Sequence, residues 1–331
     1  MVIGSCWELP IVIIILTPNP SLLAPAPHPS LLTPMFRKIV LIATISAIAA
    51  ALFQLSNAAR TQNVAQIYVF GDSLSDPGNV FKASQGQFPP SPPYFRGRYA
   101  DGLVWTEYLA QQLKLNANPD TNFAYGGATT GNSQEVPLGL LAQIDRYRAS
   151  HSSTSNNALY IIWVGANDYL GGGNDTDRPV NNSVEAVKSL VQIGAKNILV
   201  VNLPDLGKLP GTRNTQQSEV LSQLTHKHNS QLANALKNLQ QQLKSESNII
   251  YYDVNDLFNR VMNEPTKFGF LNVMNTCLNG ELNQYMVCPN PDKYLFWDDI
   301  HPSTAAHKLL AKTVANRLKS ATTQTQSAYA N

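Results

Sequence analysis

Short apolar runs alternate with longer amphipathic stretches along most of this chain. Runs of strand length occur at residues 67–70, 122–124, 159–164, 198–202 and 249–253. Stretches with helical spacing of apolar positions occur at residues 104–113, 138–148, 184–193, 214–244 and 305–318. Alternation of this kind is typical of parallel sheets whose strands are buried on both faces. The pattern therefore predicts an α/β fold in which a central parallel sheet carries helices on both faces.

The alternating pattern is predicted to form one domain over residues 60–319, since α/β folds of this length commonly form a single unit. Residues 320–331 are rich in Ser, Thr, Gln and Ala. Because such a composition buries little apolar surface, we expect them to form a flexible tail.

The amino-terminal region has the arrangement of a secretory signal peptide at residues 35–59. Arg37 and Lys38 precede an apolar run at 39–55, and small residues follow it. Residues 1–34 are either a genuine leader or an over-extended start. A run of about 17 apolar residues is the lower limit for spanning a bilayer, so an uncleaved membrane anchor is the alternative to cleavage. Cleavage predicts a secreted or periplasmic protein.

The charge of the chain excludes some classes of partner. The whole chain has 24 basic and 22 acidic residues; without residues 1–59, which hold Arg37, Lys38 and Glu8, 22 basic and 21 acidic residues remain. A nearly neutral chain without a basic stripe does not indicate nucleic-acid binding. A substrate at a membrane surface is compatible with this charge, but the chain has no long run of charged residues that would bind a membrane electrostatically.

Two motifs carry candidate catalytic chemistry. Residues 70–76 read FGDSLSD and place Ser73 after an apolar run, at the carboxyl end of a predicted strand, where open α/β sheets bind ligands. Serine needs a neighbouring base to act as a nucleophile. Residues 298–302 read DDIHP and supply His301 as that base. Asp298 or Asp299 then orients the imidazole.

Two further blocks offer hydrogen-bond donors for an oxyanion. Residues 122–128 read NFAYGGA and residues 165–168 read GAND, and each lies at a turn beside an apolar run. Acyl transfer requires preorganised N–H groups where the tetrahedral oxyanion forms. The candidates are the amide of Gly126 or Gly127 and the side chain of Asn167.

Together these blocks resemble the GDSL family of SGNH hydrolases, whose serine, glycine, asparagine and histidine fall in this chain order. The matching residues are Ser73, Gly127, Asn167 and His301. The resemblance runs from about residue 67 to 318 and also covers the blocks 97–102, 104–109 and 202–207. The family spacing favours Gly127 over Gly126, and it favours Asp298 over Asp299 because its acid lies three residues before the histidine.

The resemblance implies a flavodoxin-like three-layer αβα fold with a Ser73–His301–Asp298 triad. It also implies an oxyanion hole built from the Ser73 and Gly127 amides and the Asn167 side chain. No cofactor and no metal are expected. The implied activity is that of a serine esterase or lipase, monomeric, acting on lipids, short acyl esters or acetylated sugars. A phospholipase or acyltransferase is the alternative enzyme, and a non-catalytic secreted binding protein is the alternative from another class.

The remaining acids and histidines are expected to be structural or solvent-exposed. Short acids beside the motifs commonly hydrogen-bond nearby turn amides, which we expect of Asp72, Asp76 and Asp168. His226 and His228 are two residues apart, so they do not share a helix face and do not indicate a metal pair. We expect these two and His307 on the solvated surface.

A glycine run at residues 171–173 lacks the Lys-Ser/Thr of a phosphate loop and stands alone rather than in a calcium-binding repeat. Because it follows Asn167 closely, we expect a flexible loop beside the substrate entrance.

Two cysteines remain after the signal segment. Cys277 and Cys288 form an even pair in a chain expected to meet an oxidising compartment, so a disulfide is predicted, with two buried free thiols as the alternative. Such a bridge would brace the loop before Asp298 and His301. Two cysteines alone make a poor zinc site.

Overall fold

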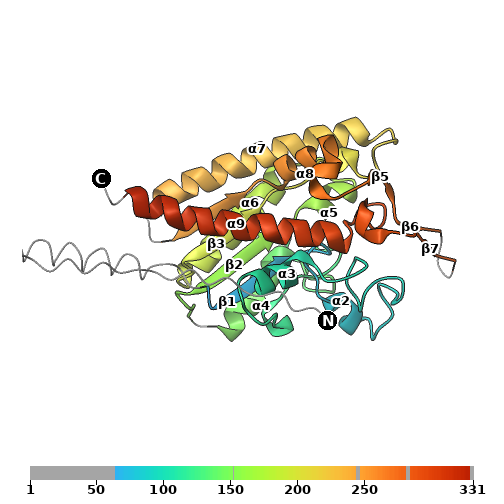
Figure 1. The fold of residues 1–331 in the computed structure, drawn as a ribbon. Helices are drawn as coiled ribbons and strands as arrows, with labels where there is room; N and C mark the ends of the chain where they lie inside the picture. The colour runs from blue at the N-terminus through green and yellow to red at the C-terminus, as the bar shows by residue number, and fades with distance from the viewer. Residues whose placement is uncertain (1–63, 152, 244–246, 281–283, 329–331) are drawn as a thin grey trace, which may run out of the picture. The chain divides into compact units, whose positions relative to one another are not determined.

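A four-stranded parallel sheet lies at the centre of the chain (Figure 1). Its strands, hydrogen-bonded in this order, are β1 (Gln66–Gly71), β2 (Ala158–Trp163), β3 (Asn197–Val201) and β4 (Asn248–Tyr252). All residues of β2 and β3 are buried, which is why they read as continuous apolar runs. The prediction of a central parallel sheet is confirmed.

This computed structural model describes residues 64–328, apart from residues 152, 244–246 and 281–283. The predicted signal segment 35–59 and residues 1–34 lie outside the described residues, so both interpretations of that region stay predictions. Among the described residues, no helix has both the length and the apolar character needed to cross a membrane.

The strand predicted at residues 122–124 is reduced to a single bridge. Asn122 pairs in parallel with Val69 of β1, and the amide of Phe123 donates to the Val69 carbonyl at 2.7 Å. The carbonyls of Asn122 and Ala124 accept from the side chain of Asn79 instead of from a neighbouring strand, each at 2.9 Å. The side chain of Asn79 thus takes the place of the backbone hydrogen bonds that a neighbouring strand would form. Counted as the second strand in chain order, this segment still gives the flavodoxin-like order 2-1-3-4-5.

Helices cover both faces of the sheet, as predicted. Helices α3 (Trp105–Gln112), α8 (Val254–Asn263) and α9 (Thr304–Ala328) pack on one face of the sheet, and α4 (Leu140–Ser150), α6 (Asp177–Gln192) and α7 (Ser218–Gln242) pack on the other. Figure 1 shows α9 and α3 side by side across the front of the sheet. The result is the three-layer αβα arrangement expected from the sequence.

The shorter elements connect these layers. They are the helices α2 (Asn79–Ala83) and α5 (Ala166–Leu170), the single turns η2 (Pro119–Thr121), η3 (Leu206–Lys208), η4 (Pro265–Phe268) and η5 (Pro291–Lys293), and the strands β5 (Asn272–Thr276), β6 (Leu278–Asn279), β7 (Met286–Val287) and β8 (Tyr294–Phe296). Strand β5 pairs with β8 in parallel, and β6 pairs with β7 as an antiparallel hairpin.

One boundary differs from the sequence prediction at the carboxyl end. Helix α9 continues through Ala328, so it includes most of the segment expected to be a flexible tail at residues 320–331. Ala, Gln, Ser and Thr can extend an existing helix, because adding a residue to a formed helix avoids the cost of nucleation. Composition alone did not reveal that a helix already enters this segment.

Candidate active site

The turn that carries Ser73 follows the last residue of β1, and the side chain of Gln143 holds the end of this strand in place. The Gly71 amide donates to the Gln143 side chain and the Gly71 carbonyl accepts from it, both at 2.9 Å. A side chain at Gly71 would put its Cβ 2.6 Å from the Trp163 carbonyl oxygen, which only glycine avoids. The strand therefore ends in a fixed position, and Ser73 projects from the following turn at the carboxyl edge of the sheet.

Three side chains meet at this edge. Nε2 of His301 lies 2.8 Å from Oγ of Ser73, and Nδ1 of His301 lies 2.8 Å from Oδ2 and 3.0 Å from Oδ1 of Asp298. Ser73 and His301 come from opposite ends of the chain and are each only 8% exposed. With Nδ1 protonated and donating to Asp298, Nε2 is free to accept the serine proton.

Asp298 is held by four donors and not by His301 alone. Its Oδ1 accepts from the amides of Ile300 and His301 at 3.0 and 2.8 Å, and its Oδ2 accepts from Oη of Tyr94 at 2.7 Å. Burial favours the neutral acid, yet the charge and hydrogen bond of His301 and the other donors outweigh it and hold the pKa of Asp298 below its usual range. Asp298 is therefore a fixed carboxylate.

Asp299, the competing acid in the sequence, turns away from His301. Its side chain is exposed, and its Cβ and carbonyl lie against Gly211, whose amide donates to the Asp299 carbonyl at 2.9 Å. The geometry places Asp298, and not Asp299, against the imidazole.

The two adjacent glycines differ in whether their amides are available. The Gly126 amide already donates to Oδ2 of Asp76 at 2.8 Å. Gly127 adopts φ +84°, a conformation that favours glycine, and within the described part of the chain its amide has no protein acceptor. The Gly127 amide is therefore the one free to meet a ligand oxygen.

Asn167 lies in α5, directly after β2. Its Nδ2 donates one hydrogen to the Ala128 carbonyl at 2.9 Å, which orients the amide and leaves the second hydrogen free. Asp168 next to it accepts from the Thr130 amide and hydroxyl, at 3.0 and 2.7 Å. These bonds fasten the Asn167 turn to the turn that carries Gly127.

With this geometry in place, comparison with known proteins identifies the family. The sequence model described as GDSL-like Lipase/Acylhydrolase matches residues 67–314. The chain belongs to the GDSL-like lipase/acylhydrolase family. This chain is an ester-bond hydrolase.

Two curated relatives and one solved structure illustrate the likeness. A phosphatidylcholine-sterol acyltransferase of Aeromonas hydrophila is 28% identical, over 77% of this chain and 90% of the relative. A thermolabile hemolysin of Vibrio parahaemolyticus is 29% identical, over 77% of this chain and 64% of the relative. A carbohydrate acetylesterase of Sinorhizobium meliloti superposes with a TM-score of 0.48 at 15% identity, over 77% of this chain and 99% of that one.

The acids beside the family motifs stabilise turns, as expected. Asp76 accepts from the amides of Gly78, Asn79 and Val80 as well as from Gly126. Asp72 accepts from the Leu74 amide at 3.0 Å. Burial raises the pKa of Asp72 to about 7, so this carboxyl places less negative charge beside Ser73 than an ordinary aspartate would.

The expectation for the other histidines is correct for His226, which is exposed, and wrong for His228 and His307, which are buried. Nδ1 of His228 lies 2.7 Å from Oη of Tyr169, so α7 is fastened to α5. Nδ1 of His307 accepts from the Trp105 amide at 3.3 Å, which joins α9 to α3. Burial lowers the pKa of His228 to about 4 and, together with the charge of His301, that of His307 to about 3.

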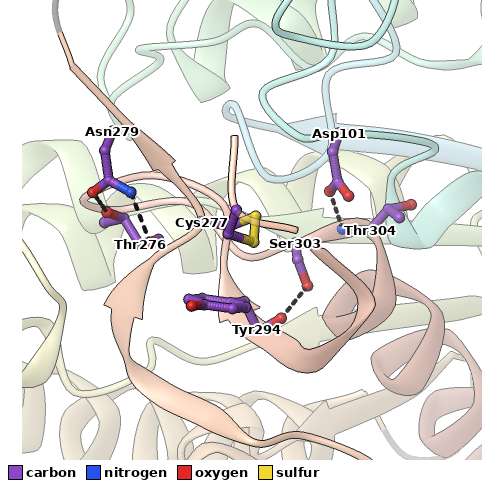
Figure 2. Close-up of a disulfide and its surroundings, with 8 residues drawn as sticks. Asp101, Thr276, Cys277, Asn279, Tyr294, Ser303 and Thr304 are labelled. Carbon is purple, nitrogen blue, oxygen red and sulfur yellow. Dashed lines mark hydrogen bonds between the residues drawn. A yellow bond between two sulfur atoms is a disulfide. The ribbon is translucent and has the colours of Figure 1, made fainter. Parts of the chain in front are cut away.

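Cys277 and Cys288 form the disulfide that the sequence predicts, with their Cα atoms 4.8 Å apart. Figure 2 shows it beside Tyr294 and Ser303. Ser303 Oγ donates to the Tyr294 carbonyl at 2.6 Å, and the Thr304 amide donates to Oδ1 of Asp101 at 2.7 Å. These bonds fix the start of α9, immediately after His301.

Several residues that support the site were not predicted. Gln143 lies on the apolar face of α4, between Leu140 and Ile144. A glutamine on the apolar face of a helix indicates that its side chain has a buried hydrogen-bond partner. Tyr94 lies in a proline-rich segment whose sequence gives no sign that its hydroxyl reaches Asp298, 204 residues away.

Ser73 and His301 lie beside a pocket of about 880 Å³, part of which is open to solvent. Ser73, Asn167 and His301 line it, and so does Leu170 at the end of α5. The glycines at 171–173, expected beside the substrate entrance, are not among its lining residues. Among the described residues, no three His, Cys, Asp or Glu side chains are grouped so as to hold a metal ion.

Proposed function

We propose that this chain hydrolyses carboxylic esters through a Ser73–His301–Asp298 triad and an oxyanion hole of Ser73, Gly127 and Asn167. The observation that carries the proposal is the continuous row of hydrogen bonds from Asp298 through His301 to Ser73. Membership of the GDSL-like lipase/acylhydrolase family supports it independently.

Acylation begins when Nε2 of His301 takes the proton of Ser73 as Oγ attacks the ester carbonyl. The negative charge that forms on the carbonyl oxygen is met by the Ser73 and Gly127 amides and the free hydrogen of Asn167, and each such donor typically contributes about 100- to 1000-fold to turnover. The imidazolium is stabilised by Asp298. The imidazolium then gives its proton to the alcohol oxygen of the ester as the bond between this oxygen and the carbonyl carbon breaks, which releases the alcohol and leaves the acyl group on Oγ of Ser73.

Deacylation repeats these steps with water as the nucleophile. His301 takes a proton from water, hydroxide oxygen attacks the acyl carbon, and the oxyanion occupies the same donors. Collapse breaks the bond to Oγ of Ser73, which regains its proton from His301, and the carboxylic acid leaves. Apart from the water molecule, the groups used in these steps are residues of this chain.

The test is covalent labelling combined with turnover. A fluorophosphonate probe should add one equivalent of mass at Ser73, and Ser73→Ala should lose labelling and at least about 10⁴-fold in kcat. Ser133→Ala, the same change on an exposed loop, is the matched control and should keep both. A folded Ser73→Ala protein with unchanged turnover would refute the mechanism. Absence of labelling in folded wild-type protein would favour a non-catalytic binding protein.

An acyltransferase is the second candidate, because a relative that shares 28% identity carries that name. The same acyl enzyme would then react with an alcohol in place of water. Adding a primary alcohol at increasing concentration and measuring ester against free acid distinguishes the two. Ester formation in excess of hydrolysis at low alcohol concentration would favour the transferase.

We further propose that the protein is exported, as a monomer, to a secreted or periplasmic location. The basic, apolar and small-residue order of residues 35–59 and the Cys277–Cys288 disulfide support export. Intact mass of the exported protein would show cleavage near residue 59; a mass that includes residues 39–55 would instead support an anchor. Sedimentation of the same sample tests the monomer.

A further inference from the structure

The pocket beside Ser73 is walled by the segments that follow the four strands, taken in the order of the sheet. The segment after each strand contributes apolar side chains to the pocket. They include Leu74 after β1, Leu170 after β2, Leu206 after β3, and Phe258 and Val261 of α8 after β4. Because β1 and β4 are the two ends of the sheet order, the pocket runs across the whole carboxyl edge and not only beside the nucleophile.

The pocket walls are held by hydrogen bonds between neighbouring elements. Oδ1 of Asn202, after β3, accepts from the Val254 amide at 2.7 Å and so fixes the start of α8. The side chain of Asn229 bonds both the amide and the carbonyl of Leu203, at 3.0 and 2.8 Å. From the other side α9 closes the pocket with Leu309 and Leu310. A wall with fixed backbone gives a pocket of defined length.

The sheet geometry gives an estimate of that length. Adjacent strands lie about 4.8 Å apart, so the three steps from β1 to β4 span about 14 Å. Three bonds advance an extended chain by about 3.5 Å, so a zigzag alkyl chain of about twelve carbons covers this distance. An acetyl group would fill only the part nearest to Ser73.

The chemistry of the lining selects an apolar ligand. None of the described lining residues is Lys or Arg, and the polar members are Asp72, Ser73, Asn167, His301 and His307. Three of these belong to the catalytic machinery. His307 is uncharged because burial lowers its pKa to about 3. A phosphate or a sugar would find few partners beyond the nucleophile, whereas an alkyl chain would bury its surface along the whole pocket.

We propose that this pocket binds the acyl chain of the ester and makes the protein selective for medium to long aliphatic acyl groups, with Phe258 and Val261 of α8 closing its far end. The inference rests on the proposed function and deepens it by naming the substrate class. The acyl side is favoured because the alcohol parts of monoacylglycerols and acylated sugars are polar, so the long apolar part of such an ester is its acyl chain.

The first experiment varies the acyl chain at constant alcohol. Each methylene that enters the pocket raises kcat/KM by up to about fourfold, so the p-nitrophenyl octanoate or decanoate should exceed the acetate by at least about a hundredfold. A second series of alkyl acetates varies the alcohol at constant acyl group and should change kcat/KM far less. Ser73→Ala measures the background. A maximum at the acetate, or a steeper rise along the alcohol series, would overturn the assignment.

The second experiment shortens the pocket. Val261→Phe should lower kcat/KM for the decanoate at least about tenfold and leave the acetate within about twofold. Val184→Phe on α6 is the matched control, since Val184 packs against the apolar core on the opposite face of the sheet, and it should leave the ratio of the two esters unchanged. If Val261→Phe does not fold, Val261→Leu gives a smaller shift in the same direction, and Phe258→Ala should move the optimum to longer chains.

Different results would overturn the acyl pocket and the esterase activity. Fluorophosphonate labelling and turnover with an acetate optimum, or equal losses for all esters in Val261→Phe, overturn the acyl pocket and leave the esterase standing. Absence of labelling and of turnover with every ester overturns both.

Discussion

Replacing Asp298 by Asn separates the orienting role of this residue from its structural role. Oδ1 of Asp298 accepts from the Ile300 and His301 amides, so the asparagine keeps its carbonyl oxygen there. The NH₂ group then takes the place of Oδ2, where it can donate to Oη of Tyr94, which still has a lone pair to accept. The Tyr94 hydroxyl hydrogen loses its acceptor, but Tyr94 is only partly buried, so we expect the fold to be retained.

The same NH₂ group faces Nδ1 of His301, at the position where Oδ2 now lies 2.8 Å away. Because a donor there pairs with an unprotonated Nδ1, the imidazole proton moves to Nε2, and His301 can no longer accept the proton of Ser73. The equivalent change in a serine protease lowers kcat by about 10⁴-fold, which corresponds to about 5.4 kcal/mol of activation free energy. We expect Asp298→Asn to lose kcat by this order.

The assay is steady-state hydrolysis of a p-nitrophenyl ester at pH 7.5, with thermal unfolding of each variant as the check on folding. Asp299→Asn is the matched control, because Asp299 is exposed and turned toward Gly211, and its kcat should stay within about twofold. Asp298→Asn with more than a tenth of wild-type kcat would refute the assigned role. So would an Asp299→Asn variant that loses as much as Asp298→Asn.

Two further predictions concern stability. The double variant Cys277→Ser/Cys288→Ser should lose about 3 kcal/mol of unfolding free energy in urea titrations, since the loop entropy of the unfolded chain is no longer restricted; a loss below about 0.5 kcal/mol would contradict this. Burial lowers the pKa of His228 to about 4 from its ordinary 6.5, so its contribution to stability is fully present above about pH 6.5 and is lost as the pH falls toward 4. His228→Asn should flatten the fall in unfolding free energy between pH 7 and 4 by up to about 3 kcal/mol, and an unchanged slope would show that His228 is not kept neutral.

The sheet and its covering helices follow from the sequence because their signals are local. Strand β2 is apolar at every position, and α7 repeats Leu at helical spacing. A few neighbouring residues are therefore enough to predict that each element is buried. Helix α8 was not predicted, although Asp253 caps it and Val254, Leu257 and Val261 share one face. Helix α8 has ten residues and begins two residues after β4 ends. The apolar run of the strand therefore obscures the change from strand spacing to helical spacing of apolar residues.

Contacts between distant segments explain most of what the sequence did not show. The segment at residues 122–124 reads as a strand, but whether it pairs depends on Asn79, which takes two of its carbonyls. Strands β5 to β8 are too short to carry a period, and their positions depend on the disulfide and on pairing across the loop. The choice between Gly126 and Gly127 likewise depends on Asp76, 50 residues before Gly126.

The two buried histidines show why a catalytic base needs its carboxylate. His228 and His307 are as inaccessible as His301, yet their recorded partners are a tyrosine hydroxyl and a backbone amide, and neither stabilises an imidazolium. Burial therefore keeps both neutral, whereas in the proposed mechanism the carboxylate of Asp298, 2.8 Å from Nδ1, stabilises the imidazolium of His301 while the acyl enzyme forms. A histidine in the sequence becomes a base only when the fold brings a fixed carboxylate to one ring nitrogen and a nucleophile to the other. In this chain the short segment from Asp298 to His301 supplies the first condition locally, and the return of β8 and α9 to the end of β1 supplies the second.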